Sequence, residues 1–242
     1  MYRDNSRISD YASPPCFAHE LEAGYAGASV RDRSAAEDVR RWRRAERERL
    51  ISARLSLTDE ERERLSREII GEIEQWVEPG PGLKIGLYWP WRAEPDLRGC
   101  FESWHRKGAR VALPVVHARH QPLVFRQWTP SCRLRPGAMK IPVPVEGVEI
   151  VPNVVVAPLV GFDAQGYRLG YGGGYFDRTL ASLEPQPFTI GVGYASQQIA
   201  TIYPQAHDVP MDIVIHGRNQ VIERPGLWPQ RPGRARRRHG VG

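Results

Sequence analysis

Residues 162–178 read Phe162-Asp163-Ala164-Gln165-Gly166-Tyr167-Arg168-Leu169-Gly170-Tyr171-Gly172-Gly173-Gly174-Tyr175-Phe176-Asp177-Arg178, and glycine occupies four of the five positions from 170 to 174. An apolar segment at 154–160 precedes this stretch, and a helix-like segment at 175–183 follows it. Glycine lets backbone N–H groups approach an anion closely, and the start of a helix attracts negative charge. A strand, a glycine loop and a helix in this order predict a phosphate-binding site.

Two charged side chains flank the glycines. Arg168 can hold a phosphate through two parallel hydrogen bonds, and Asp177 can hold a magnesium ion that bridges phosphates. The pattern differs from the common nucleotide fingerprints, because it lacks a Gly-Lys-Ser/Thr ending and has Tyr175 where a dinucleotide fingerprint requires glycine or alanine. The alternative interpretation is a tight surface turn, which explains most isolated glycine clusters.

Composition and length predict a globular protein with one domain. The chain has 242 residues, of which 41% are hydrophobic and 26% are charged. No apolar run approaches the roughly 20 residues of a membrane helix, and the N-terminus lacks the apolar region of a secretory signal. The three cysteines, Cys16, Cys100 and Cys132, match neither a disulfide framework nor a zinc site. We therefore expect a cytoplasmic protein without a membrane partner.

The net charge of +6 comes from the C-terminal segment. Residues 218–242 contain seven arginines and one glutamate, so the rest of the chain is neutral. The segment is also rich in proline and glycine, which predicts a disordered tail over 223–242. Such a tail can attract polyanions without specificity. We expect no specific nucleic-acid partner, and keep a nucleic-acid-binding protein as an alternative hypothesis.

Apolar periodicity predicts alternating helices and strands after a loose extension at 1–36. A capping-box pattern, Thr58-Asp59-Glu60-Glu61, opens the second helix. Helices are expected at 37–55, 58–77, 96–107 and 175–183, a helical turn at 197–201, and strands at 83–88, 110–116, 123–128, 154–160, 188–194 and 212–215.

The alternation predicts a single α/β domain over 37–222, with a three-layer, open, largely parallel sheet and helices on both faces, as in Rossmann-like folds. Ligands of such sheets bind at the carboxyl ends of the strands, where the glycine loop, Glu94 and Asp208 fall.

Residues 168–177 resemble the signature of the 5-formyltetrahydrofolate cyclo-ligase family, whose members are also called 5,10-methenyltetrahydrofolate synthetases. The resemblance covers about residues 39–218. It includes the Arg-rich helix before 57–62, Tyr88-Trp89-Pro90 with Glu94 and Asp96, and Gly191-Val192-Gly193-Tyr194 with Gln198, Pro204 and His207-Asp208.

The resemblance implies an enzyme that uses ATP and Mg²⁺ to convert 5-formyltetrahydrofolate to 5,10-methenyltetrahydrofolate, with release of ADP and phosphate. Its partners would be these two substrates, and we expect a monomer. Phosphorylation of the formyl oxygen would make the formyl carbon electrophilic enough for attack by N10. Such phosphoryl transfer depends on positioning and electrostatic stabilisation, so no serine, cysteine or histidine nucleophile is required.

The resemblance also implies roles for individual residues. It gives catalytic roles to Arg168 and Tyr175, folate binding to Trp89 and Glu94, and metal binding to Asp177 and Asp208. The residues implied in ATP binding are Arg43, Arg47, Arg168, Leu169, Gly170, Tyr171, Gly172, Gly173, Gly174, Tyr175 and Phe176.

Each of these residues also has an ordinary structural interpretation. Arg43 and Arg47 lie four apart and can form a solvated helix face, while the aspartates can be caps or surface charges. Glu94 can be an exposed loop acid. Trp128 and Phe162 can stack on a pterin ring or belong to the core.

Four features depart from the family pattern. Arg43 and Gly173 stand where many members have lysine, Phe176 replaces a frequent tyrosine, and residues 215–219 lack a common Thr-Glu pair. These departures leave a second hypothesis, a nucleotide-binding paralogue with another substrate or a regulatory role. Glu94 favours the enzyme, because a pure nucleotide binder does not need a folate-binding acid.

Overall fold

The computed structural model describes residues 28–224, and side chains from position 35 onward. The expected extension up to position 27 and the expected tail from position 225 lie outside the described residues. The chain divides into two compact units, Met1–Trp42 and Arg43–Gly242. The described part of the first unit is the beginning of helix α1 (Ala28–Leu55). This helix starts before the expected position 37, because residues 28–36 contain no proline or glycine to prevent it.

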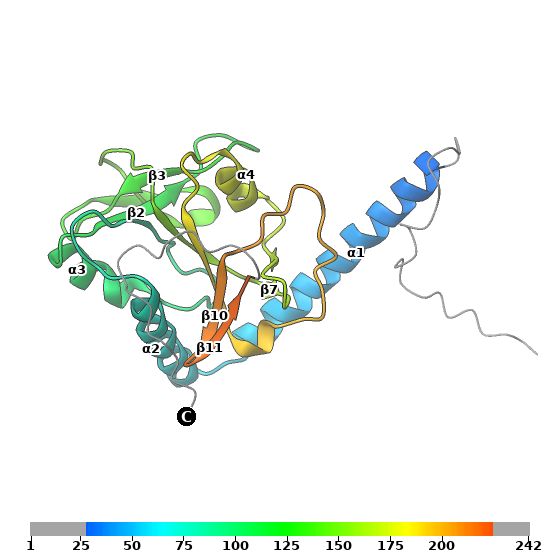
Figure 1. The fold of residues 1–242 in the computed structure, drawn as a ribbon, viewed down its shortest axis with the longest axis horizontal. Coiled ribbons are helices and arrows are strands. Elements are labelled where there is room, and N and C mark those ends of the chain that lie inside the picture. Colours follow the sequence, from blue (N-terminus) through cyan, green and yellow to red (C-terminus); the bar gives the residue numbers. More distant parts are fainter. Residues whose placement is uncertain (1–27, 225–242) are drawn as a thin grey trace, which may run out of the picture. The chain divides into compact units, whose positions relative to one another are not determined.

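The second unit contains the remaining elements (Figure 1). Its helices are α2 (Asp59–Trp76), α3 (Arg98–Arg106) and α4 (Tyr175–Ser182), with short 3₁₀ turns η1 (Ala138–Lys140) and η2 (Ala195–Gln197). Its strands are β1 (Lys84–Gly86), β2 (Arg110–Val115), β3 (Val124–Gln127), β4 (Leu134–Pro136), β5 (Pro142–Pro144), β6 (Val154–Pro158), β7 (Gly161–Phe162), β8 (Arg168–Leu169), β9 (Phe188–Val192), β10 (Ile213–Gly217) and β11 (Gln220–Glu223).

A seven-stranded sheet in the order β11-β10-β9-β6-β1-β2-β3 forms the centre of this unit. The five inner strands run parallel, and the edge strands β3 and β11 pair antiparallel with their neighbours. The predicted α/β class with a largely parallel sheet is confirmed. Strand β11 was not expected, and it forms a hairpin with β10 through a turn at Asn219, where φ is +55°.

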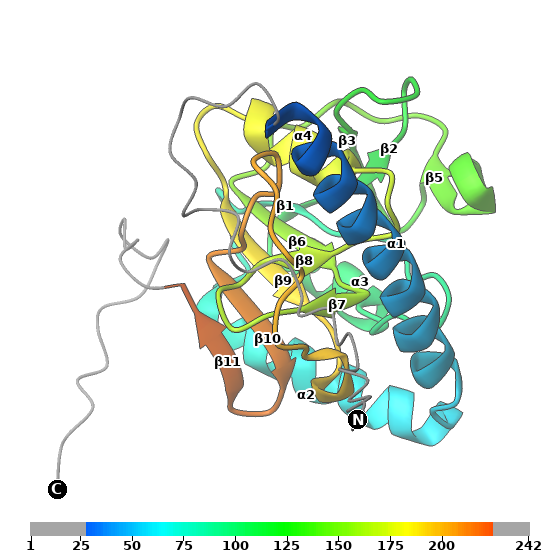
Figure 2. The ribbon, with the colours of Figure 1, turned by 90° about the vertical axis from the view of Figure 1, so that its right-hand side faces the viewer.

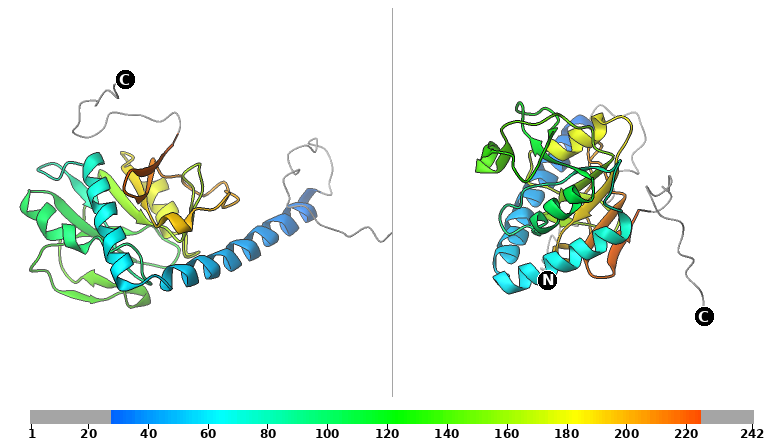
Figure 3. Two further views of the ribbon diagram at one scale, coloured as in Figure 1. Left: turned by 90° about the horizontal axis from the view of Figure 1, so that it is seen from below. Right: turned by 90° about the vertical axis from the view of Figure 1, so that its left-hand side faces the viewer.

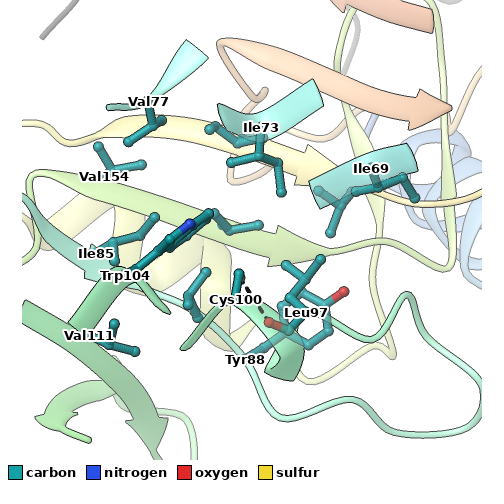
Figure 4. Close-up of a cluster of buried hydrophobic side chains, with 14 of the residues drawn as sticks. Ile69, Ile73, Val77, Ile85, Tyr88, Leu97, Cys100, Trp104, Val111 and Val154 are labelled. Carbon is teal, nitrogen blue, oxygen red and sulfur yellow. Dashed lines mark hydrogen bonds between the residues drawn. The ribbon is translucent and has the colours of Figure 1, made fainter. Parts of the chain in front are cut away.

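Helices cover both faces of the sheet (Figures 1 and 2). One face carries α2 and α3, whose apolar side chains meet those of β1, β2, β6, β9 and β10. Figure 4 shows Ile69, Ile73 and Trp104 directed toward this face. Figure 3 shows α2, in cyan, beside the orange strands at the β10 end of the sheet. The opposite face carries α4, whose Leu180 is 1% exposed and packs with Val155 and Val214.

Helix α2 begins as the sequence predicts. Thr58 caps it, because its hydroxyl accepts from the N–H of Glu61 at 3.2 Å and the Glu61 carboxylate accepts from the N–H of Thr58 at 2.8 Å. The pattern satisfies two N–H groups that the first helical turn would leave free. No helix in the described range is both long and apolar enough to cross a membrane.

The direction of the chain along the sheet changes between β1 and β6. From β1 the chain proceeds through β2 to β3, and from β6 it proceeds through β9 to β10 on the other side. In an open parallel sheet, such a switch leaves a crevice at the carboxyl ends of the two strands. The loop after β1 carries Trp89 and Glu94, and the chain after β6 leads into the glycine loop. The topology therefore brings the two predicted half-sites together.

Candidate functional site

A pocket lies at this switch point. Three segments line it: the loop after β1, the η1–β5 segment, and the glycine loop with the start of α4. Trp89, Glu94, Arg168, Tyr175 and Asp177 are among its lining residues. Residues predicted to serve folate and residues predicted to serve phosphate thus face one cavity.

A short hairpin supports the glycine loop. Strands β7 and β8 pair antiparallel, and the buried Asp163 accepts backbone N–H bonds from Gln165 and Tyr167, each at 3.1 Å. Gly172 and Gly174 have φ values of +92° and +61°, which side chains other than glycine rarely adopt. Gly174 also precedes the first residue of α4 as its N-cap. The loop therefore enters the helix with exposed backbone N–H groups, as an anion site requires.

Arg168 and Asp177 form a buried ion pair beneath this loop. The guanidinium of Arg168 lies 2.9 Å from Oδ1 of Asp177, and their side chains are 3% and 16% exposed. Arg168 also donates to the carbonyl of Val209 at 3.3 Å, and its guanidinium lies over the ring of Phe176 at 5.7 Å. Burial lowers the pKa of Arg168, while Asp177 and Asp208 raise it in part.

Arg43 binds Asp208 through both carboxylate oxygens. Its Nη1 lies 3.3 Å from Oδ1, and its Nη2 lies 2.5 Å from Oδ2. The same guanidinium donates to the carbonyls of Ile202 and Tyr203 at 2.9 and 2.8 Å. Burial alone would raise the pKa of Asp208, but the hydrogen bonds from Arg43 and from the Gln205 N–H hold it below its ordinary value. A lysine, with its single nitrogen, could not bind each oxygen through a separate nitrogen.

Arg47 and Arg178 lie against the glycine loop itself. Nε of Arg47 donates to the carbonyl of Gly170 at 2.7 Å, and Nη2 of Arg178 donates to the carbonyl of Gly173. The sequence reasoning quoted Arg178 but gave it no role.

Glu94 is a buried acid of the pocket, with 5% of its surface exposed. Its Oε2 accepts the N–H of Trp91 at 2.9 Å. Burial raises the pKa of Glu94 to about 7, although Arg54, the Trp91 N–H and the Tyr171 hydroxyl each lower it. Glu94 is therefore not the exposed loop acid of the alternative interpretation, and both its protonation states are populated near neutral pH.

Arg54 connects the two halves of the pocket, although the sequence reasoning missed it. It is fully buried, and it donates to the carbonyls of Arg92 at 2.9 Å and Leu159 at 3.0 Å. Its Nη2 also donates to the hydroxyl of Tyr171, whose ring packs on Trp91 with centroids 4.8 Å apart. Tyr171 of the glycine loop thus reaches the loop that carries Glu94.

Several predicted residues lie behind the pocket rather than on its wall. Leu169 is 1% exposed and packs with Leu50 and Ile202. Phe162 is fully buried against His216, and Trp128 packs edge-on against Phe101 at 5.4 Å. Neither aromatic ring lines the pocket.

The donor set suits a metal ion that is shared with phosphates. Among residues 28–224 no group of three or more His, Cys, Asp or Glu side chains could hold a metal ion. Mg²⁺ commonly binds through one or two carboxylates and the phosphates of its substrate. Within the described residues, Oδ1 of Asp177 accepts from Arg168 and from the N–H of Val209, which leaves Oδ2 to a metal ion. Asp208 could ligate only by exchanging contacts that it makes with Arg43.

Comparisons with known proteins agree on one family. A model of the 5-formyltetrahydrofolate cyclo-ligase family matches residues 39–217. The 5-formyltetrahydrofolate cyclo-ligase of Haemophilus influenzae is 30% identical over 148 residues, which cover 57% of this chain and 79% of that protein. The protein of the same name from Escherichia coli K12 is 29% identical over 170 residues, 67% of this chain and 93% of that protein.

Two solved structures share the fold. The Aquifex aeolicus 5,10-methenyltetrahydrofolate synthetase matches with a TM-score of 0.66 and 29% identity, covering 82% of this chain and 99% of that chain. The 5,10-methenyltetrahydrofolate synthetase from Mycoplasma pneumoniae matches with a TM-score of 0.59 and 25% identity, covering 73% of this chain and 98% of that chain.

Proposed function

The chain belongs to the 5-formyltetrahydrofolate cyclo-ligase family, and we propose that it converts 5-formyltetrahydrofolate to 5,10-methenyltetrahydrofolate while ATP is cleaved to ADP and phosphate. One observation carries this proposal beyond the family match. The glycine loop, with its Arg168–Asp177 pair, faces the same pocket as the buried acid Glu94. We further propose that the enzyme acts as a cytoplasmic monomer.

The reaction needs an activated formyl group. The formyl oxygen attacks the γ-phosphorus of ATP and ADP leaves. N10 then attacks the formyl carbon and loses its proton, and the formyl oxygen departs with the phosphate. The protein's task is to align the two substrates and to stabilise charge on the transferred phosphoryl group. A pocket that joins a nucleotide loop to a folate-binding acid is suited to that task.

Backbone groups and side chains would have different roles in binding the nucleotide. Backbone N–H groups at 170–176 and the start of α4 would bind the phosphates, with Arg47 and Arg168 adding positive charge. Tyr175 lines the pocket and would contact the reacting groups. In the structure described, Arg43 uses its guanidinium to hold Asp208 and the 202–203 backbone. A direct contact between Arg43 and ATP would require some of these bonds to open.

Asp177 and Asp208 are the proposed Mg²⁺ ligands. The metal would neutralise charge on the phosphates and orient them. Asp177 fits this role without rearrangement, because its Oδ2 is available. Asp208 fits only if Arg43 turns from Asp208 toward the phosphates, which would couple metal binding to a movement of the Arg43 side chain.

The folate half of the site would use Glu94 and Trp89. A pterin ring presents both N–H donors and nitrogen acceptors, and a carboxyl with a pKa near 7 can accept a hydrogen bond or donate one. Trp89 lines the same pocket as Glu94 and would pack its indole against the pterin ring.

The function can be tested by near-ultraviolet absorbance of 5-formyltetrahydrofolate mixed with the protein, Mg²⁺ and ATP. The methenyl product has an extended chromophore that the substrate lacks. The proposal predicts an absorbance rise that requires both ATP and Mg²⁺. No rise, with ATP binding intact in a separate titration, would contradict it and favour a nucleotide-binding paralogue with another substrate. We retain the paralogue as a second candidate because Gly173 replaces a lysine and Phe176 replaces a tyrosine that are frequent in the family.

Asp177→Ala tests the metal assignment. We expect this variant to lose ATP-dependent turnover and to stay folded at lower stability, because Arg168, whose side chain is 3% exposed, loses its ion-pair partner. Turnover is followed by the same absorbance change, and the fold by circular dichroism. Turnover close to that of the wild type would remove Asp177 from the proposed site.

A further inference from the structure

Arg178 is a charged residue at the start of α4, beside the glycine loop, that has no role in the proposed mechanism. It lies four residues after Gly174 on α4, so its side chain leans back over the start of the helix. Its Nη2 donates to the carbonyl of Gly173, and its guanidinium lies over the ring of Tyr175 at 5.4 Å. Its Nε is buried without a hydrogen-bond partner.

The arginines around the loop fall into two classes. Arg43 and Arg168 each form an ion pair with an aspartate. Arg47 and Arg178 have no acidic partner within 4.0 Å in the described part of the chain, and each donates to one carbonyl of the loop instead. A carbonyl neutralises no charge, so both guanidinium groups keep a full positive charge beside the same backbone.

The lack of a side chain at Gly172 and at Gly174 leaves space for the guanidinium groups of Arg47 and Arg178, respectively. A Cβ atom at Gly172 would lie 3.5 Å from Cζ of Arg47, and one at Gly174 would lie 2.9 Å from Nη1 of Arg178. Burial lowers the pKa of Arg47, and the nearby charge of Arg43 lowers it further. Two guanidinium groups beside the same short loop, neither paired with an acid, favour the binding of an anion there.

We propose that Arg178, at the start of α4, is a second phosphate-binding arginine beside the glycine loop, which acts together with Arg47 on the β- and γ-phosphates of the bound nucleotide. This inference rests on the proposed function, because it takes ATP as the anion. The competing explanation is that Arg178 only supports the loop through its bond to Gly173.

Nucleotide titrations of Arg178→Gln separate these explanations. We expect ATP and ADP to bind the full-length variant roughly 10- to 100-fold more weakly, the loss of one charge-assisted hydrogen bond, while AMP loses less than about threefold. Arg106→Gln, at an arginine side chain 72% exposed on α3, is the matched control and should bind as the wild type does. Equal losses for AMP and ATP would show a collapsed loop, and ATP binding within twofold of wild type would show no contact. Either result would overturn the proposal.

The second test replaces the lost charge of Arg178 with a lysine at another position of the glycine loop. In the Arg178→Gln background, Gly173→Lys should recover most of the lost ATP affinity, whereas Gly173→Ala should not. The alanine variant is needed because a Cβ atom at position 173 would lie 2.8 Å from the Tyr175 ring, which must turn aside in both variants. Equal ATP binding by the two double variants would show that Arg178 supplies loop shape rather than charge.

These results are independent of the catalytic assay. If wild-type protein forms the methenyl product and Arg178→Gln binds ATP normally, the inference fails and the proposed function stands. If the wild type forms no product and Arg178→Gln still weakens ATP and ADP selectively, the phosphate contact stands and the proposed function fails.

Discussion

The ionisation of Glu94 makes folding depend on pH. Burial raises its pKa from 4.5 to about 7, so the fold favours the protonated carboxyl. That stabilisation is complete below pH 4.5 and is lost as the pH rises through about 7. At 1.36 kcal/mol per pKa unit it amounts to about 3 kcal/mol. We expect denaturant unfolding of the wild type to show this loss between pH 4.5 and 8, and Glu94→Gln not to show it.

The difference between the two proteins isolates Glu94 from other titrating groups. The pKa of His216 is lowered by burial and that of Asp208 is lowered by Arg43, but both residues are present in each protein. Parallel curves of unfolding free energy against pH would contradict the raised pKa of Glu94.

The hydroxyl of Tyr171 affects the pKa of Glu94. It lowers the pKa of Glu94 and accepts a hydrogen bond from Arg54. Tyr171→Phe keeps the ring that packs on Trp91 and removes only the hydroxyl. We expect the Glu94-dependent inflection in the pH profile of kcat/KM for 5-formyltetrahydrofolate to rise by about half to one unit, the effect of one hydrogen bond.

The profile of Glu94→Gln identifies which inflection belongs to this acid, because that variant should lack it. A merely structural role for Tyr171 would change kcat/KM at every pH by the same factor and leave the inflection in place. An unshifted inflection would therefore exclude tuning by the hydroxyl.

At the scale of the element, a buried arginine holds the C-terminal end of helix α1 in place within the second unit. Arg54 donates to the carbonyls of Arg92 and Leu159, and the Leu159 carbonyl also accepts from Nε2 of Gln197 at 3.0 Å. Arg54→Leu removes the side-chain donor to the buried Arg92 carbonyl and one of the two donors to Leu159, so we expect the free energy of unfolding to fall by about 2–4 kcal/mol. Arg44→Leu on the same helix is the control, since the Arg44 side chain is 82% exposed and pairs with the exposed Glu48. Its loss should stay below about 0.5 kcal/mol. Similar urea midpoints for the two variants would contradict the anchoring role.

The sequence predicts the long elements well and the short ones poorly. Helix α2 carries its own start signal in Thr58 and Glu61, and β6 is a continuous apolar run that only a buried inner strand explains. Strands β4 and β5 contain Pro136, Pro142 and Pro144, and proline normally counts against a strand. Strands β7 and β8 have two residues each, and tertiary contacts hold them rather than any local pattern.

For the whole molecule, the sequence locates the site but does not distinguish its arginines. The glycine loop and Glu94 are predicted to fall after strands, and the topology brings Glu94 and most of residues 168–177 to one pocket. Arg54 and Arg178 belong to a chain in which Lys and Arg number 34, so neither stands out by type. Burial and partner carbonyls, which only the folded chain creates, separate Arg54 from the exposed Arg44 on the same helix. Trp128 and Phe162 show the reverse, because aromatic residues suggest stacking and the fold uses them as core.

Removal of the basic C-terminal segment tests whether its positive charge contributes to catalysis. Strand β11 ends at Glu223, and the N–H of Arg224 donates to Asp212 at 2.9 Å, so a cut after Arg224 keeps the sheet intact. The cut removes five arginines and no acidic residue, which lowers the net charge of +6 to +1. We expect the truncated enzyme to elute from heparin at lower salt, because fewer cations displace counterions. Its kcat/KM should stay within twofold of the full chain, since every proposed site residue precedes the cut. A large loss of kcat/KM would make the tail part of the catalytic unit, whereas unchanged heparin retention would place the polyanion-binding charge on the folded unit.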